Sequence, residues 1–246
     1  MPITSAELIK YGAASRPEDD TSASGGAIDT LCTLDVTQLA ANDNLEALSD
    51  NAADTMNLDI YGRDAAGARV NEVRALNGTT VVSFVTNTLE RFLRAALASA
   101  PAGNVTIRRA GAGATVAVIP AGMRYANTLF IDSSSEAATT VRYEKEFWKN
   151  TDPALTLNAA KLQLTADPDT SIEIGMETTK NGTGSVTNRK TAPGGVSFVD
   201  DAIDINLPGT TLEAGSAIGL WVKMTRGASA APLKSSYTTQ IAGTTV

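Results

Sequence analysis

The 246-residue sequence has no histidine and a single cysteine, Cys32. Histidine is the commonest general base, the usual partner of a catalytic serine or cysteine, and a frequent metal ligand. One cysteine allows no intrachain disulfide and no cysteine-based zinc site, and it is typical of a protein folded in a reducing cytosol. These absences exclude the common hydrolase and metalloenzyme templates. We expect Cys32 to be a small buried hydrophobic residue.

Positive charge and long apolar runs are also scarce. The chain has 20 Lys and Arg against 27 Asp and Glu, a net charge of −7, and its basic residues are scattered. Nucleic acids and anionic membranes are bound through clustered Lys and Arg, so neither is an expected partner. No window approaches the roughly 18 apolar residues of a membrane span, and residues 1–20 lack the apolar stretch of a signal peptide. We predict a soluble protein without a standard export signal.

Residues 1–50 are rich in Ala, Ser, Asp and Asn and show no strong periodicity. This composition predicts an extended N-terminal arm, with a disordered tail as the alternative. The apolar residues of the region are too sparse to build a core, so we expect them to dock on a neighbouring subunit. The candidate subunit-interface residues are Ile28, Leu31, Leu34 and Val36.

From residue 57 apolar and polar residues alternate, with turn-forming sequences between the runs. Asn77-Gly78 predicts a two-residue hairpin turn in which Val73 faces Val82. Residues 103–123, GNVTIRRAGAGATVAVIPAGM, predict a second hairpin that reverses at its glycines. Residues 87–103 are ambiguous, because their neighbours favour strand while their own apolar spacing favours a helix. That spacing is formed by Leu89, Phe92, Leu93, Ala96 and Leu97.

Similar runs continue from residue 141, separated by TDPA, ADPD, KNGTG, APGG and LPG. Short strands punctuated by turns at this frequency predict antiparallel β-sandwiches. We therefore predict a mainly β protein with two antiparallel β-sandwich domains, Ig-like or jelly-roll-like, preceded by the arm. The predicted domains are residues 51–135 and 141–246, and residues 132–140, DSSSEAATT, supply the link.

The glycine-rich stretch also raises the alternative of a phosphate-binding loop. Such a loop requires a strand, a glycine turn and then a helix whose amides meet the phosphate. Here Val116 replaces the third glycine of G-x-G-x-x-G, and a β-branched run ended by Pro120 follows. The hairpin is therefore the favoured interpretation.

Carboxylates offer two further chemistries. A pair of them could hydrolyse a glycoside, and the loops at residues 18–20 and 167–170 could bind calcium. The sequence has no D-x-[DN]-x-[DN]-G pattern, and carboxylates on strands and loops are the ordinary solvated face of an acidic protein. We predict no enzymatic activity, no cofactor and no metal site. The carboxylates considered for a pair are Asp200, Asp201, Asp204, Glu173 and Glu177.

Two segments resemble modules of virion structural proteins from tailed bacteriophages. The first is NLDIYGRDAAGARVNEVRALNGTTVV followed by GNVTIRRAGAGATVAVIPAGM. The second is FWKNTDPALTLNAAKLQLTADPDTSIEIGMETT followed by TAPGGVSF and LEAGSAIGLWVKMT, and GGAID resembles an arm segment that precedes the first module. The matches span most of residues 22–241 and consist of strand and turn patterns without an active-site signature.

The resemblance implies a non-enzymatic virion protein, assembled in the host cytoplasm as a homo-oligomer and bound to major capsid or tail proteins. A small acidic chain that is not a fibre repeat fits a capsid decoration or head protein, attached through its N-terminal arm. A tail or baseplate protein is the alternative. A carbohydrate-binding adhesion module is a rival from another class, and it would use the aromatic residues Trp148, Tyr125 and Tyr237.

Overall fold

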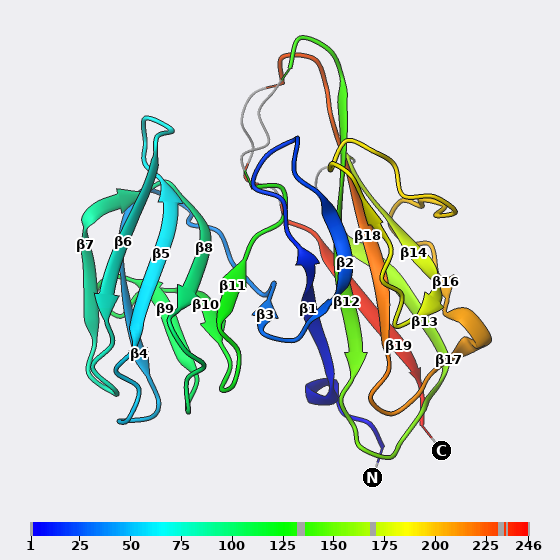
Figure 1. Cartoon of the computed structure of the whole chain (residues 1–246), viewed down its shortest axis with the longest axis horizontal. Helices are drawn as coiled ribbons and strands as arrows, with labels where there is room; N and C mark the ends of the chain where they lie inside the picture. The colour runs from blue at the N-terminus through cyan, green and yellow to red at the C-terminus, as the bar shows by residue number, and fades with distance from the viewer. Residues whose placement is uncertain (1, 132–135, 168–170, 231–233, 235, 246) are drawn as a thin grey trace. The chain divides into compact units, whose positions relative to one another are not determined.

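The computed structural model describes residues 2–131, 136–167, 171–230, 234 and 236–245. The chain is mainly β, with several antiparallel sheets (Figure 1). It divides into two compact units: unit 1 comprises Met1–Asp29 and Leu129–Val246, and unit 2 comprises Thr30–Thr128. Unit 2 is therefore an insertion in the sequence of unit 1. Within the described ranges, no helix is long and apolar enough to cross a membrane.

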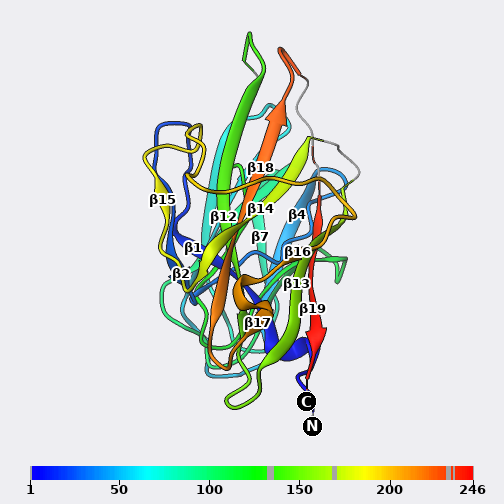
Figure 2. The same cartoon turned by 90° about the vertical axis from the view of Figure 1, so that its right-hand side faces the viewer.

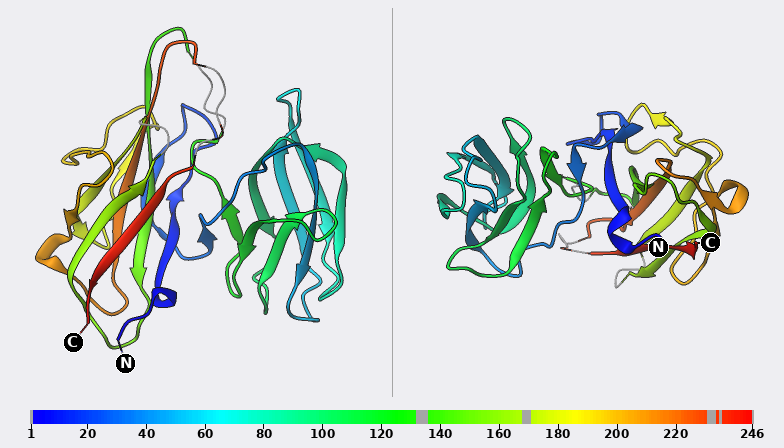
Figure 3. Two further views of the ribbon diagram at one scale, coloured as in Figure 1. Left: turned by 180° about the vertical axis from the view of Figure 1, so that it is seen from behind. Right: turned by 90° about the horizontal axis from the view of Figure 1, so that it is seen from below.

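Unit 1 contains a six-stranded sheet and a smaller sheet built on one long strand. The order of the first sheet is β14-β18-β12-β1-β2-β15, and all its pairs are antiparallel. Its strands are β1 (Leu8–Ser15), β2 (Ser24–Asp29), β12 (Thr140–Asn150), β14 (Ile172–Lys180), β15 (Ser185–Val186) and β18 (Ala217–Arg226). Figure 3 shows β1, in blue, beside β12, in green.

In the smaller sheet, β13 pairs with three other strands (Figure 2). These strands are β13 (Leu157–Ala166), β16 (Ile205–Asn206), β17 (Thr211–Leu212) and β19 (Thr238–Thr244); two 3-10 turns, η1 (Ser5–Glu7) and η2 (Pro208–Thr210), complete the unit. Leu162 and Leu164 of β13 form one apolar cluster with Ile218, Leu220 and Val222 of β18. Because both sheets contribute to this core, unit 1 is a β-sandwich.

The N-terminal arm predicted for residues 1–50 is wrong, because β1 and β2 belong to the sheet of unit 1, and β3 (Cys32–Thr33) and β4 (Asp43–Ser49) belong to the sheets of unit 2. β1 pairs with β12 from Leu8↔Asn150 to Gly12↔Glu146, and β2 pairs with β1. The composition misled because the buried positions of these strands are filled largely by glycine, alanine and serine rather than by large apolar side chains. Residues 141–246 consequently share their sheet with the N-terminal strands, and the compact units begin and end elsewhere than the predicted domains 51–135 and 141–246.

Unit 2 also contains two sheets. One has the order β10-β9-β4-β7, and the other has the order β3-β11-β8-β5-β6. The strands are β3 (Cys32–Thr33), β4 (Asp43–Ser49), β5 (Asn57–Arg63), β6 (Arg69–Ala75), β7 (Val82–Leu89), β8 (Arg91–Leu97), β9 (Val105–Arg109), β10 (Thr115–Ile119) and β11 (Tyr125–Asn127). Leu45 and Phe84 of the first sheet and Ile60 of the second line one small cavity, so the sheets face each other. Cys32 is buried, as predicted.

The predicted hairpin at residues 103–123 is confirmed, whereas the one at Asn77-Gly78 is wrong. β9 and β10 pair antiparallel, with Ile119 opposite Val105. In contrast, β6 pairs with β5 and β7 pairs with β4, so the turn at Gly78 joins the two sheets. Gly78 has φ +54°, and a Cβ there would lie 2.6 Å from the carbonyl oxygen of Ala52. The turn therefore requires glycine, although the strands on either side of it do not form a hairpin.

The ambiguity at residues 87–103 is resolved in favour of strand, since this run ends β7 and forms β8. β8 pairs with β5, and Tyr61 lies opposite Arg94 while the next residue, Gly62, lies opposite Phe92. This β-bulge leaves Leu93 as an extra residue, and both Phe92 and Leu93 are buried. A bulge shifts the two-residue period by one, which produced the spacing that resembled a helix.

Candidate functional site

Strand β12 carries a row of charged side chains into the interior of unit 1. Opposite residues of paired strands share a face, and Glu144 lies opposite Val222 while Glu146 lies opposite Leu220. Glu144, Glu146 and the neighbouring Arg142 are each at most 2% exposed. Charges buried to this degree need partners, because desolvation disfavours an isolated ion.

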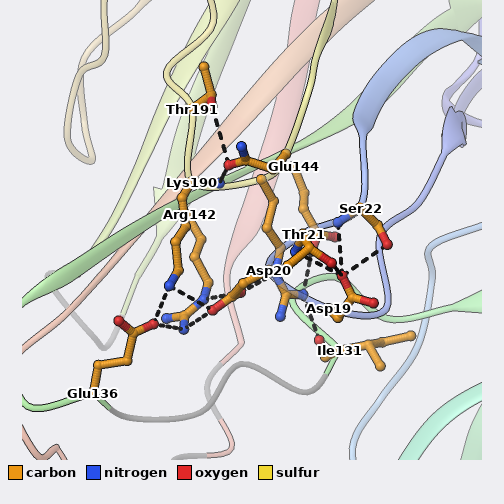
Figure 4. Close-up of polar contacts among 12 residues, drawn as sticks. Asp19, Asp20, Thr21, Ser22, Ile131, Glu136, Arg142, Glu144, Lys190 and Thr191 are labelled. Atoms are coloured by element: carbon orange, nitrogen blue, oxygen red, sulfur yellow. Dashed lines mark hydrogen bonds and ion pairs between the residues drawn. The ribbon is translucent and has the colours of Figure 1, made fainter.

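The partners come from two loops and from the segment before β12. We define the ion-pair cluster as Asp20, Glu136, Arg142, Glu144, Arg189 and Lys190; Figure 4 labels all of these except Arg189. Arg142 donates to both carboxylate oxygens of Asp20, from Nε at 2.7 Å and from Nη2 at 2.6 Å. Arg189 Nε donates to Asp20 Oδ1 at 2.6 Å. The β1–β2 loop, β12 and the loop after β15 therefore meet at one carboxylate.

The rest of the cluster extends from the interior to the surface. Arg189 Nη1 lies 3.2 Å from Glu144 Oε1 in the interior. Towards solvent, Lys190 Nζ lies 2.5 Å from Glu136 Oε1 and 3.3 Å from Asp20 Oδ2. Arg142 Nη2 completes the rim at 3.1 Å from Glu136 Oε1. Three cations thus face three carboxylates.

The half-buried Asp20 and the buried Glu144 differ in their electrostatics. Burial raises the pKa of Asp20, but the hydrogen bonds and charges of Arg142 and Arg189 outweigh it and hold this pKa well below its ordinary value. Burial raises the pKa of Glu144 to about 7, although the charge of Arg189 acts in the opposite direction. Asp20 is therefore a permanent anion, whereas Glu144 titrates near neutral pH.

Glu146, farther along β12, belongs to a second polar network. Tyr237 Oη donates to Glu146 Oε2 at 2.8 Å, Thr239 Oγ1 donates to Oε1 at 3.1 Å, and Lys10 Nζ lies 3.3 Å from Oε1. Trp148 Nε1 donates to Thr239 Oγ1 at 3.3 Å. Burial is the largest cause that raises the pKa of Tyr237 well above its ordinary value. Trp148 and Tyr237, two of the aromatics considered for glycan binding, are engaged within unit 1.

On the opposite face of β12, Lys145 joins three segments. Its Nζ donates to Glu177 Oε1 at 2.7 Å and to the carbonyl oxygens of Gly26 at 3.0 Å and Gly182 at 3.1 Å. Burial lowers the pKa of Lys145, and Glu177 opposes this shift. Glu177, a candidate for the carboxylate pair, is thus paired with a lysine.

The other sequence-predicted carboxylates lie apart from the cluster. Glu173 pairs with Lys223 at 2.5 Å, and Asp204 pairs with Lys161. Asp200 accepts a hydrogen bond from the amide of Asp201. Of the two loops considered for calcium, 18–20 contributes Asp20 to the cluster, and 168–170 of the second loop lie outside the described residues. Among described side chains, no group of three His, Cys, Asp or Glu is placed to hold a metal ion.

The glycine turn considered for phosphate binding holds a carboxylate of the chain itself. The amides of Gly111 and Ala112 donate to Glu46 at 3.0 Å and 2.9 Å. Arg108 Nε also donates to Glu46 at 2.7 Å. Backbone amides of such turns bind anions, and here the anion is a neighbouring strand's side chain.

The four predicted interface residues are divided between the units. Ile28 is half-buried in β2 of unit 1, opposite Ala13. The other three belong to unit 2. Leu31 is 39% exposed, whereas Leu34 and Val36 are half-buried, and Val36 bridges to Ala117. The aromatic Tyr125 lies in β11, with the Arg124 guanidinium 5.3 Å from its ring centre.

Sequence reasoning missed Arg142, Glu144 and Arg189. For Arg142 and Glu144 the available signal was the run VRYEKEFWKN, in which a strand-like segment carries charges at both parities and so places them on both faces of a sheet. Arg189 lies outside this run and had no such signal.

No protein-family model matches the sequence, and no curated protein or solved structure is significantly similar to it. A function for this chain must therefore be argued from its own residues.

Proposed function

We propose that the chain is a non-enzymatic structural component of a tailed-phage virion, and that it is a capsid-associated decoration or head protein. The observation that carries the proposal is the set of strand and turn motifs that resemble phage virion modules. These motifs occupy shape-determining positions. LNGTT holds Gly78 at the turn between the two sheets of unit 2, and IPAG holds Gly122, whose φ is +80°.

The internal use of charge supports a structural role. Asp20 binds two buried arginines, and Lys145 binds Glu177 and three backbone carbonyls. These contacts tie the first 29 residues to segments more than 100 positions later. A particle component needs this kind of fixed tertiary structure, because its surface is matched to those of its neighbours.

The attachment surface proposed here is on unit 2 rather than on a free arm. Among the described residues, six large apolar side chains are exposed, and five of them belong to unit 2. Protein–protein contacts use exposed apolar surface, and these five side chains are the apolar surface that unit 2 offers to a partner. The five are Leu31, Val73, Val81, Val85 and Val118.

Locating the chain in particles tests the proposal. We expect antibodies against the purified chain to label the heads of particles from a lysate of cells that carry the gene. Labelling of tails would assign the chain to the tail or baseplate instead. If mass spectrometry of purified particles fails to detect the chain while it is abundant in the lysate, the proposal is wrong.

A further inference from the structure

The sequence contains two Asn-Gly pairs, Asn77-Gly78 in unit 2 and Asn181-Gly182 in unit 1. In such a pair the glycine nitrogen can attack the side-chain amide carbon of the asparagine, because glycine has no side chain to obstruct the approach. The product is a cyclic succinimide, which water opens to aspartate or isoaspartate. Both asparagines are exposed, so a difference between the pairs must come from their hydrogen bonds.

The peptide bond of Asn77-Gly78 is held by hydrogen bonds at both its nitrogen and its oxygen. The Gly78 amide donates to the Asp54 carbonyl oxygen at 2.9 Å, and the Asn77 carbonyl oxygen accepts from the Thr80 amide at 2.9 Å. Gly78 is buried, and its own carbonyl oxygen accepts from the Ser49 amide at 2.9 Å. A peptide bond rotates as one plane. Turning the Gly78 nitrogen towards the asparagine side chain therefore breaks these bonds.

The peptide bond of Asn181-Gly182 is not held in this way. It follows β14, which ends at Lys180. Within the described ranges, neither the Asn181 carbonyl oxygen nor the Gly182 amide has a hydrogen-bond partner. Lys145 Nζ donates to the Gly182 carbonyl oxygen, but that oxygen belongs to the next peptide bond. The Gly182 nitrogen can therefore turn towards the Asn181 side chain without breaking a hydrogen bond of its own peptide plane.

A backbone amide is also placed to promote attack on the Asn181 side chain. The Ala217 amide, at the start of β18, donates to Asn181 Oδ1 at 2.8 Å, and the Asn181 amide donates to the Ala217 carbonyl oxygen at 2.7 Å. When a nitrogen attacks the side-chain carbon, negative charge develops on Oδ1. An N–H group that already points at this oxygen stabilises the developing charge, as the donors of an oxyanion hole do.

We propose that Asn181 is a site of spontaneous covalent modification in the folded chain, and that Asn77 is not. The Gly182 amide gives its proton to water, and its nitrogen forms a bond to the Asn181 side-chain carbon. The bond from this carbon to Nδ2 breaks, and the leaving nitrogen takes up a proton and departs as ammonia. Water then opens the ring at either of its two carbonyl groups. The net reaction consumes one water and releases one ammonia, without any other reactant.

The isoaspartate product changes the surroundings of Lys145. Its main chain runs through the former side chain, which adds a methylene group just before Gly182. Lys145 Nζ donates to the carbonyl oxygens of Gly182 at 3.1 Å and Gly184 at 3.3 Å. Gly182 also packs closely on Glu177, since a Cβ on this glycine would lie 2.3 Å from Glu177 Oε2. The longer backbone displaces acceptors of a buried cation, so the isoaspartate form is expected to unfold at a lower urea concentration.

Peptide mapping of the full chain during incubation at mildly alkaline pH tests the proposal. Mass spectrometry measures conversion at each Asn-Gly pair, and heavy-oxygen water labels the opened ring. In the folded chain we expect Asn181 to convert at least about tenfold faster than Asn77, whose hydrogen bonds must break first. The same chain in concentrated urea is the control, and there the two rates are expected to converge. Equal rates in the folded chain, a faster Asn77, or an Asn181 that converts only in urea would overturn the proposal.

Two variants connect the modification to stability. Asn181→Gln keeps an amide but must close a larger ring, so it is expected to stay intact and to keep one urea transition throughout the incubation. Asn77→Gln is the matched control, expected to convert at Asn181 and to lose stability as the wild type does. If Asn181→Gln fails to fold, the isoaspartate and unmodified fractions of the wild type are separated and compared. Fractions that unfold at the same urea concentration would refute the effect on Lys145.

Discussion

Asp20 balances two guanidinium groups that have no access to solvent. Arg142 and Arg189 are both 0% exposed, and each donates to the same carboxylate. A buried ion pair contributes little compared with a well-packed apolar replacement, but removing one partner leaves a charge in a medium that solvates it poorly. We therefore expect unit 1 to be most sensitive to substitutions that remove one partner of a buried ion pair.

Asp20→Asn tests this sensitivity. We expect it to lower the free energy of unfolding by about 3 kcal/mol, because it removes the anion shared by two buried cations. Urea denaturation followed by circular dichroism measures the change. Asp19→Asn is the matched control, since the bonds of Asp19 to described residues go to the nearby Thr21 and Ser22 and to none of the arginines. Equal losses in the two variants would contradict the assigned role of Asp20.

Glu144 makes the free energy of unfolding of unit 1 depend on pH with the opposite sign from Asp20, whose pKa is lowered by its arginine partners. Its pKa is raised from 4.5 to about 7, so the folded state keeps a proton that the unfolded state releases. The free energy of unfolding is therefore expected to fall as pH rises from about 4.5 to about 7. Glu144→Gln removes this slope. Denaturant titrations at pH 5 and pH 7.5 measure it, and an unchanged slope in the variant would refute the assignment.

The residues of the ion-pair cluster are visible in the sequence, but their partnership is not. Asp20 and Arg142 are 122 positions apart, and Asp20 and Arg189 are 169 positions apart. Local patterns carry no information on such distances. Cys32 was predictable as a buried residue because its own hydrophobicity decides its place, whereas the place of a charge depends on its partner.

Strands and turns were predictable where their partners are adjacent in sequence. The β9–β10 hairpin joins two neighbouring runs, so its glycines and alternation sufficed. The hairpin predicted at Gly78 was wrong because β7 pairs with β4, from an earlier part of the chain, instead of with β6. The strand β8 was not predicted for another reason. One extra residue, Leu93, forms a bulge that converts an alternating pattern into one with helical spacing.

Gly78→Ala tests the turn that joins the two sheets of unit 2. Its Cβ would lie 2.6 Å from a backbone oxygen, in addition to the strain of φ +54°. We expect a loss of about 3 kcal/mol in the free energy of unfolding. Gly122→Ala is the matched control, because φ is +80° there and nothing lies within 4 Å. Only conformational strain remains in the control, about 1 kcal/mol. A control as damaging as Gly78→Ala would exclude the steric explanation.

At the scale of the whole molecule, unit 1 is assembled from both ends of the chain. Deletion of residues 1–29 removes β1 and β2 from between β12 and β15, together with Asp20. We expect the truncated chain to lose the cooperative unfolding of unit 1, while residues 30–128 expressed alone unfold cooperatively. Circular dichroism and calorimetry measure both. If unit 1 of the truncated chain melts as in the full chain, residues 1–29 are not needed for its folding, as expected of the arm predicted from composition.

The attachment proposed for unit 2 predicts a separation between stability and assembly. Val73→Asp and Val85→Asp change side chains that are 49% and 56% exposed. They are expected to alter the free energy of unfolding by less than about 1 kcal/mol and to reduce incorporation into particles. Ile203→Asp, in unit 1 and 49% exposed, is the control that incorporates normally. Quantitative mass spectrometry of particles distinguishes the outcomes.

The insertion of unit 2 also orders events during translation. β1 and β2 leave the ribosome before unit 2, yet β12, the strand with which β1 pairs, begins only at residue 140. The whole of unit 2 emerges during that interval and has time to fold, whereas β1 still lacks its partner β12. A nascent chain whose residue 128 has just left the ribosomal exit tunnel would therefore present a complete unit 2 next to N-terminal strands that have not yet paired with β12.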